Sequence, residues 1–434
     1  MVHETRIFIS EYESEERLRE PDSFSLPAPL FASRPHQVLM KGIDGLTIAM
    51  AKDGDTLITR TPLSPVYQNY WNKEIAAVNY RSPGVNSDET ESIYERLRKD
   101  KDSHELLKQG HMEHYALVPE FYDLCQALEI PVSAPPLSLI QKLNGKSWSN
   151  ELKWKYDLPA MGIHVSSVAE YEEAARTMLA ENGRVLIKDS MGVSGKGILL
   201  IDSPKMAERL AVHFRRQEEK GKRQFDFVLE PCLDRKTDFS CQFQIERSGK
   251  LVINGYQKNR SKGYAYLGSM PLGEAEYELL QKAGYPEVIT WIADEMASLG
   301  YYGYACIDSM ITAEDQVIPL LEINPRMSMA RFNLVLGEKL HTQCSLGYTE
   351  GVSHGECSVS DVLTELEEAG ILYTKARGCG LIPLAPNTWA LPECEGTKVR
   401  IYFVIAYDNK DDYETILDSW LGYCARRICT GAVR

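Results

Sequence analysis

The sequence lacks the features that mark membrane-spanning and exported proteins. Nowhere do about 18 apolar residues follow one another, which is the length that a helix needs to cross a bilayer. The N-terminal stretch MVHETRIFISEYESEE has neither the basic start nor the apolar core of a secretory signal. No internal repeat and no low-complexity tract is present. We therefore expect a globular protein of the cytoplasm that does not bind membranes.

Paired cysteines and excess positive charge are absent too. The ten cysteines include no CxxC pair and are scattered over 434 residues, which predicts reduced thiols and no structural zinc. The formal net charge is -14, so the chain should not attract nucleic acid. Small molecules are the expected partners. The length allows roughly two to four domains.

Several catalytic signatures are also missing. The sequence has no GxSxG and no HExxH, and its nearest histidine pair, in HMEH at residues 111–114, has a different spacing. The loop SMGVSGKG at residues 190–197 has its glycines in the order G-x-x-G-x-G between two apolar runs. This order excludes a Walker phosphate loop and does not fit the dinucleotide-binding fingerprint, which lies between a strand and a helix.

Composition divides the chain into three parts. Strand-like and helical stretches alternate up to about residue 140, which indicates an α/β domain over 1–140. The expected strands are 5–10, 45–50 and 55–60, and the expected helices are 90–99 and 120–129. The proline-rich segment 130–140 indicates a boundary. We expect a second domain over 141–350 and a C-terminal α+β segment over 351–434, with a strand at 399–407 and a helix at 411–427.

The middle part places a lysine beside the glycine loop. The pattern predicts a helix at 168–180, strands at 184–189, 198–202 and 225–230, and a helix that opens at Ser203 and Pro204. Lys188 lies in the first of these strands between apolar residues, so its charge requires a partner, and a phosphate group would serve. The glycines would let backbone N–H groups approach phosphate oxygens. A simple hairpin turn that needs only positive φ is the alternative.

A second cluster follows at residues 304–333. Strands at 305–311 and 317–323 flank a short turn, and pairing that is symmetric about Asp315 would set Asp308 opposite Glu322. Two carboxylates about 5 Å apart repel by roughly 3 kcal/mol at an effective dielectric near 20, and a cation would remove that cost. Asn324 shares a face with Glu322 because side chains alternate along a strand. These oxygen ligands suit magnesium better than the alternative, a solvated acidic hairpin.

Together, Lys188, the glycine loop and the segment EINPR at residues 322–326 resemble the ATP-grasp superfamily, whose ligases activate a carboxylate as an acyl phosphate. The resemblance is strong over about 141–333. It implies an α/β protein of the α+β grasp type, in which an N-terminal α/β pre-grasp domain precedes a two-lobed ATP-grasp domain and a small C-terminal α+β segment. It also implies ATP and two Mg²⁺ ions, with Mn²⁺ as a substitute.

The resemblance implies a role for each matching residue. Lys146 corresponds to the first nucleotide lysine, with Lys142 and Lys153 nearby, and Lys188 to the second, which reaches the α and β phosphates. Gly192 and Gly195 of the glycine loop correspond to positions that close over the phosphates. The carbonyl of Glu230 and the N–H of Leu233 correspond to the positions that bind adenine, and Asp238 to the one that binds the ribose. The magnesium ligands are Asp308, Glu322 and Asn324. Arg326 braces the transferred phosphate and, with Lys188, is the expected catalytic pair, while Lys258, Arg260 and Lys262 lie where a mobile loop often touches substrate.

Three functions fit this pattern. The first is a ligase that joins a carboxylate, of an amino acid or peptide, to an amine. The second is a ligase that loads an amino acid onto the phosphopantetheine thiol of an acyl carrier protein. The third is a nucleotide sensor without catalysis, which the retained lysines and acids disfavour. A homodimer is compatible with each of them.

Overall fold

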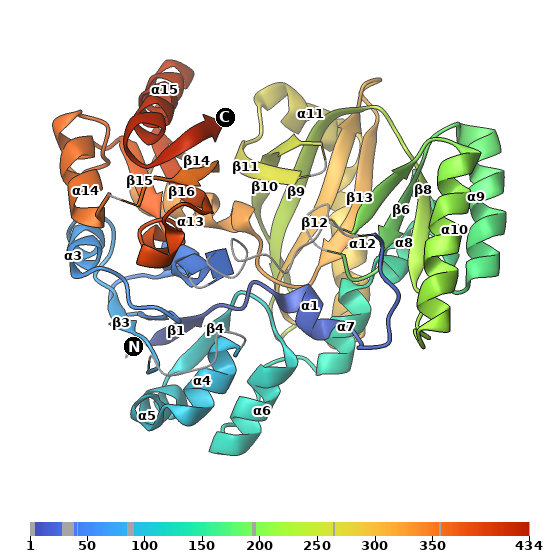
Figure 1. The fold of residues 1–434 in the computed structure, drawn as a ribbon, viewed down its shortest axis with the longest axis horizontal. Helices are drawn as coiled ribbons and strands as arrows, with labels where there is room; N and C mark the ends of the chain where they lie inside the picture. The colour runs from blue at the N-terminus through green and yellow to red at the C-terminus, as the bar shows by residue number, and fades with distance from the viewer. Residues whose placement is uncertain are drawn as a thin grey trace.

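The computed structural model describes residues 5–27, 39–40, 42–84, 91–192, 197–263, 265–355 and 357–433. Figure 1 shows three groups of elements: an N-terminal α/β domain, a small lobe at α9 and α10, and a long sheet that reaches the C-terminal end. Within the described ranges, no helix is long and apolar enough to cross a membrane. The cysteines of the described ranges form no disulfide with one another.

The N-terminal domain is built on a parallel sheet in the order β3-β2-β1-β4. Its strands are β1 (Arg6–Ile9), β2 (Thr56–Ile58), β3 (Asn79–Arg81) and β4 (His111–His114). The helices in this part of the chain are α1 (Ser14–Leu18), α3 (Pro65–Glu74), α4 (Ile93–Lys99), α5 (Lys101–Gln109) and α6 (Pro119–Leu128). The loops after β1, β2 and β4 leave from the same edge because the strands are parallel, and this edge supplies side chains to the site described below.

One expected strand in this domain is wrong. Residues 45–50 belong to the 3₁₀ helix η1 (Ile43–Met50), and all eight of its residues are buried. An apolar run that is buried on every side carries no alternation, so its pattern cannot distinguish a strand from a helix. The proline-rich boundary is irregular over 130–136, and α7 (Leu137–Asn144) and α8 (Lys146–Lys155) follow it.

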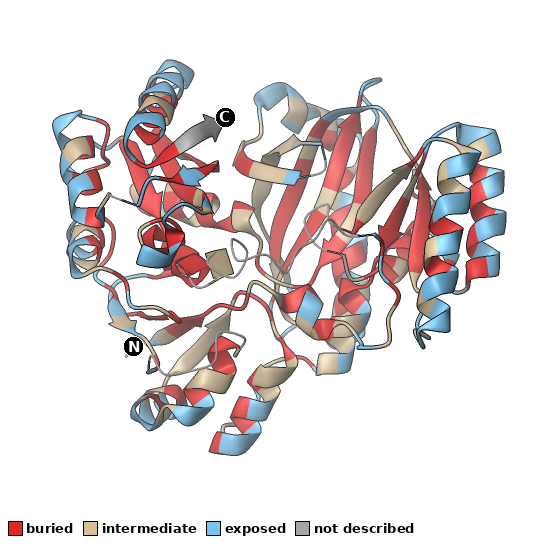
Figure 2. Ribbon diagram, viewed as in Figure 1, coloured by how far each residue is buried: buried red, intermediate tan, exposed pale blue. Residues whose placement is uncertain are grey.

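The small lobe is a four-stranded antiparallel sheet in the order β5-β8-β6-β7, with two helices packed against it. Its elements are β5 (Ile163–Val165), α9 (Val168–Asn182), β6 (Val185–Asp189), β7 (Ile198–Ile201), α10 (Pro204–Glu219) and β8 (Phe227–Pro231). Ser167 caps α9 by accepting a hydrogen bond from the Glu170 N–H, and Pro204 opens α10. The inner sides of α9 and α10 share one core with the sheet, and Figure 2 shows those sides buried.

The long sheet has the order β13-β12-β9-β10-β11-β14-β16-β15, and β17 pairs with β14. Its strands are β9 (Arg235–Ile245), β10 (Leu251–Lys262), β11 (Ala265–Pro271), β12 (Gly303–Thr312), β13 (Val317–Asn324), β14 (Gln343–Ser353), β15 (Gly380–Leu384), β16 (Lys398–Tyr407) and β17 (Cys429–Val433). The helices are α11 (Glu274–Lys282), α12 (Tyr285–Ser298), α13 (Met329–Leu340), α14 (Val359–Glu368) and α15 (Lys410–Arg427), with short 3₁₀ helices η2 (Pro386–Thr388) and η3 (Pro392–Cys394). The expected boundary at residue 350 falls inside β14, and the sheet continues across it.

The β12–β13 hairpin has the predicted register at its polar end. Asp308 pairs with Glu322 and Cys306 with Asn324, whereas nearer the turn Met310 pairs with Ile318. The register therefore shifts between Asp308 and Met310, so that β13 carries more residues than β12 there. Pro319 lies in this irregular stretch, where its missing N–H does not interrupt a regular ladder. The bulge brings the two carboxylates face to face.

Candidate nucleotide and metal site

One face of the long sheet is polar, and the candidate site lies on it. Along β9, Phe239, Cys241 and Phe243 are fully buried on the face that α12 covers. The alternate residues, which include Ser240 and Gln242, point to the other face. Ladder pairing sets Gln242 beside Cys306 and Ser240 beside Asp308, so the polar face of β9 continues into β12 and β13.

The centre of this face is an acid pair with an amide beside it. Asn324 Nδ2 donates to Asp308 Oδ2 at 3.1 Å, and Asp308 lies opposite Glu322 in the ladder. Burial, and then the facing charge of Glu322, raises the pKa of Asp308. Burial opposes ionisation of Glu322 as well, but Lys146 and Lys188 outweigh it and lower the pKa of Glu322. The pair is thus one ionised carboxylate beside one that holds its proton more tightly, which is the strain that a bound cation relieves.

Lys146 connects the two lobes at this acid pair. It is the first residue of α8, it is buried, and its Nζ lies 3.1 Å from Glu322 Oε2. The same Nζ donates to the carbonyl of Gly192 at 2.8 Å, at the start of the glycine loop. Lys142, one of the two neighbouring alternatives, is exposed on α7. Of these, Lys146 is the lysine that the structure brings to both the acid pair and the loop.

Lys188 and Lys153 share one buried carboxylate. Lys188 Nζ lies 2.6 Å from Glu230 Oε2, and Lys153 Nζ lies 2.6 Å from Glu230 Oε1. The charge of Lys188 was expected to require a partner, for which a phosphate was suggested; in the structure an acid on the adjacent strand β8 neutralises it. Sequence reasoning assigned only the backbone carbonyl of Glu230 and missed its side chain, although an acid in the apolar run FVLEP was a signal. Burial would raise the pKa of Glu230, but the two ammonium groups lower it.

The base of the glycine loop is held by close backbone packing. A Cβ atom at Gly192 would lie 2.5 Å from the Gly197 Cα, and one at Gly197 would lie 2.4 Å from the Gly192 Cα. These two glycines are needed for close approach, and neither has a positive φ. Asp189, just before the loop, receives a 2.7 Å ion pair from Arg19. Gly195 lies outside the described residues.

Arg326 lies beside Asn324, and its guanidinium group contacts several neighbouring residues. It donates to Asn324 Oδ1 at 3.0 Å and to the carbonyl of Met327 at 3.1 Å, and its guanidinium contacts the Tyr115 ring. Its strongest partner is Glu15 of α1, at 2.6 and 2.8 Å. Sequence reasoning missed Glu15, for which the charged stretch SEYESEERLRE after β1 was the available signal. Burial would raise the pKa of Glu15, but Arg326 lowers it.

The adenine and ribose positions lie along β8 and β9. The Cys232 N–H donates to Arg184 O at 3.1 Å, so the pairing of β8 extends one residue past its end, and Leu233 comes next. Asp238 accepts from Arg235 at 2.7 Å and from Ser261 Oγ at 2.8 Å, and it is partly exposed. This pair of donors fixes the carboxylate at the start of β9.

Two of the three basic residues on β10 have partners elsewhere. Lys258 forms a 2.6 Å ion pair with Glu276 of α11, and Arg260 donates to Tyr413 of α15 at 3.0 Å. The side chain of Lys262 lies outside the described residues. The partners of Lys258 and Arg260 are thus residues outside the acid pair.

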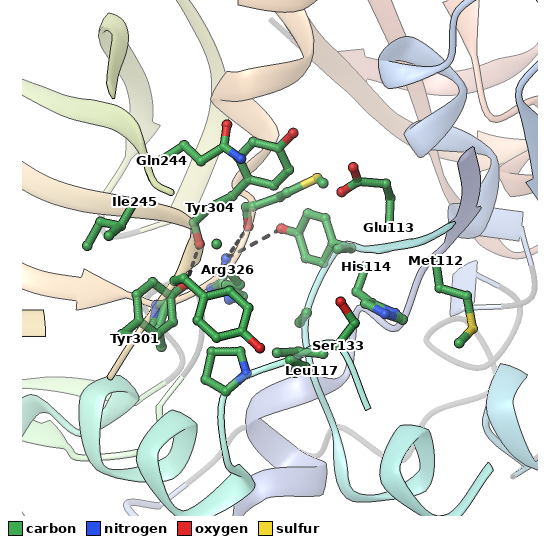
Figure 3. Close-up of a pocket in the computed structure, with 18 of the residues that line it drawn as sticks. Met112, Glu113, His114, Leu117, Ser133, Gln244, Ile245, Tyr301, Tyr304 and Arg326 are labelled. Carbon is green, nitrogen blue, oxygen red and sulfur yellow. Dashed lines mark hydrogen bonds between the residues drawn. The ribbon is translucent and has the colours of Figure 1, made fainter. Parts of the chain in front are cut away.

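A cavity of about 190 Å³ lies between the N-terminal domain and the long sheet. Figure 3 shows Glu113 and His114 of β4 on one side of it, Tyr304 and Tyr301 on the other, and Arg326 between them. Among the predicted site residues that the structure describes, Arg326 lines this cavity. Burial raises the pKa of the Glu113 carboxyl more than the nearby cations lower it.

The described residues suit a phosphate–magnesium site better than a site for a softer metal. They contain no group of three or more histidine, cysteine or acidic side chains placed to hold a metal ion. Asp308, Glu322 and Asn324 supply oxygen ligands only, which suits Mg²⁺ bound jointly by protein and phosphate. Two neighbouring lysines, Lys146 and Lys188, supply positive charge for a polyphosphate.

The chain resembles a curated protein over about half of its length. No family model matches the chain. A curated relative is the "[Butirosin acyl-carrier protein]--L-glutamate ligase" of Niallia circulans, 22% identical over 237 residues, which are 52% of this chain and 54% of that protein. The match thus spans about half of the relative's length.

Solved structures resemble the chain over almost all of its length. The biotin carboxylase–β-γ-ATP complex of Campylobacter jejuni has a TM-score of 0.58 at 10% identity, covering 100% of this chain and 93% of that one. The ADP complex of purK, an N5-carboxyaminoimidazole ribonucleotide synthetase, has a TM-score of 0.51 at 16% identity, covering 96% of both chains. Identities this low establish the fold alone. The chain therefore has the ATP-grasp fold.

Proposed function

We propose that the protein is an ATP-dependent ligase that activates a carboxylate, of an amino acid or peptide, as an acyl phosphate. One observation carries this proposal: Lys146 links the glycine loop to the Glu322–Asp308 pair at the junction of the two lobes. Nucleotide phosphates placed there would meet two lysines on one side and oxygen ligands on the other. Asp308, Glu322 and Asn324 would hold Mg²⁺, which would supply charge neutralisation at the phosphates.

In this proposal the reaction has two steps. A carboxylate oxygen of the acid attacks the γ-phosphorus of ATP, the bond to the β,γ-bridging oxygen breaks, and ADP leaves. A nucleophile then attacks the carbonyl carbon of the acyl phosphate, and inorganic phosphate leaves. The chain contributes position and charge: Lys146 and Lys188 neutralise phosphate oxygens, backbone N–H groups of the glycine loop cover them, and Arg326 braces the transferred group.

Two acceptors fit this chemistry. An amine would attack the acyl phosphate directly, and it is the acceptor that the sequence favours. The thiol of an acyl carrier protein is the second, and it is supported by the relative whose name describes a carrier-protein–L-glutamate ligase. A non-catalytic sensor is less well supported, because a protein that only binds adenine has no need for the paired acids at Asp308 and Glu322.

The test is ADP release with ATP and Mg²⁺, screened over amino acids, with hydroxylamine present to trap an acyl phosphate as its hydroxamate. We expect one group of acids to stimulate ADP release and to give a hydroxamate in equal amount. Adding amines, or an acyl carrier protein with its phosphopantetheine arm, to the active acid then separates the two acceptors. ATP binding without acid-dependent ADP release or hydroxamate would contradict the ligase.

A further inference from the structure

The carboxylate of Glu230 forms ion pairs with two lysines, which come from different elements and contact different oxygens. Lys153 comes from α8 and binds Oε1, whereas Lys188 comes from β6 and binds Oε2. Because each lysine uses a separate oxygen, one can leave without breaking the contact of the other. All three side chains are at most 6% exposed, so bulk water does little to stabilise their charges.

The two lysines differ in burial and in their other contacts. The side chain of Lys153 is 0% exposed, and its Nζ has a second contact with the carbonyl of Ala160 at 3.4 Å. Lys188 is 6% exposed and lies two strand positions before the glycine loop. Lys153 is therefore the more deeply buried of the two and has a second contact, whereas Lys188 lies next to the glycine loop.

These contacts raise a problem for nucleotide binding. If Lys188 turns to the phosphates, the buried Glu230 carboxylate loses one of its two cations. A buried carboxylate with no cation is strongly unfavourable, so the move would be opposed unless a second cation stays behind. Lys153 is that second cation.

We propose that Lys153 is a positioning residue that keeps Glu230 neutralised while Lys188 moves from Glu230 to the nucleotide phosphates. This inference rests on the proposed function, because it assumes that Lys188 binds ATP. It assigns Lys153 no contact with the nucleotide. Its influence on ATP affinity passes entirely through Glu230.

The test measures binding of a non-hydrolysable β,γ-imido analogue of ATP with Mg²⁺ by titration calorimetry on the full chain. Lys153→Met should weaken binding at least tenfold, because Lys188 becomes the only cation left for Glu230. Lys155→Met, two residues along α8, is the matched control; Lys155 is 55% exposed and pairs with Glu295, and the variant should bind like the wild type. Adding Glu230→Gln to Lys153→Met should restore binding to within threefold of wild type, since an amide does not retain Lys188.

Each outcome decides the proposal. Wild-type affinity in Lys153→Met would overturn it. Weak binding that persists in the double variant would also overturn it, because the loss of affinity would then come from altered packing and not from the charge of Glu230. If Lys153→Met does not fold, as judged by its melting temperature, the double variant alone decides: wild-type binding supports the proposal, and weak binding in the folded double variant overturns it. A wild-type chain that binds no ATP would reject both the proposed function and this inference.

Discussion

Replacing Glu322 with glutamine should separate catalysis from nucleotide binding. Glu322 lies 3.1 Å from Lys146 Nζ and opposite Asp308. Two unit charges at that distance interact by about 5 kcal/mol at an effective dielectric near 20, before desolvation and partial exposure reduce the figure. Loss of one well-placed electrostatic stabiliser typically costs about 3 to 4 kcal/mol in the barrier. We therefore expect kcat to fall by roughly 10² to 10³.

ATP affinity should fall much less, because the adenine is assigned to β8 and not to the acid pair. The assay is acid-dependent ADP release at saturating ATP, together with calorimetric Kd values and melting temperatures. Glu295→Gln is the control, since Glu295 is a surface acid that pairs with Lys155 and accepts from Tyr156. A Glu322→Gln protein that folds normally and releases ADP at the wild-type rate would refute the metal-site assignment.

Three further predictions follow from contacts around the site. Glu15→Gln should lower the free energy of unfolding by about 2 kcal/mol in urea titrations, because Arg326 loses its buried counter-charge but keeps a hydrogen bond; an unchanged midpoint would contradict this. Gly192→Ala should cut ADP release at least tenfold, since a Cβ there meets the opposite backbone at 2.5 Å, whereas Gly84→Ala, in open space, should leave the rate unchanged. Burial lowers the pKa of His114 to about 3, below its unfolded value near 6.5, so stability should fall as pH drops from about 6.5 towards 3. Between pH 7.5 and 5, His114→Asn should reduce the acid-induced loss of unfolding free energy by about 2 kcal/mol. Equal losses in the variant and the wild type would refute the lowered pKa of His114.

Local pattern was sufficient wherever a short stretch determines its own structure. Pairing symmetric about Asp315 predicted that Asp308 would face Glu322, and the ladder has that pair, but the register shift nearer the turn, which sets Met310 opposite Ile318, was not predicted. The strands on either side of the glycine loop, and the helices after them, followed from periodicity and from start signals such as Pro204. Spacing is decisive in these cases because neighbouring residues share one backbone geometry.

Tertiary structure decided which charges meet. Nothing in the local pattern indicates that Glu15 would reach Arg326 across 311 positions of the chain, or that Glu230 would accept both Lys153 and Lys188. The run at Ile43–Met50 is a related case, because burial on all sides erased the alternation that would have revealed its conformation. The physical reason is common to all of them: an ion pair or a core contact depends on how separate elements pack, and a sequence records each element's own periodicity but not its distance to the others.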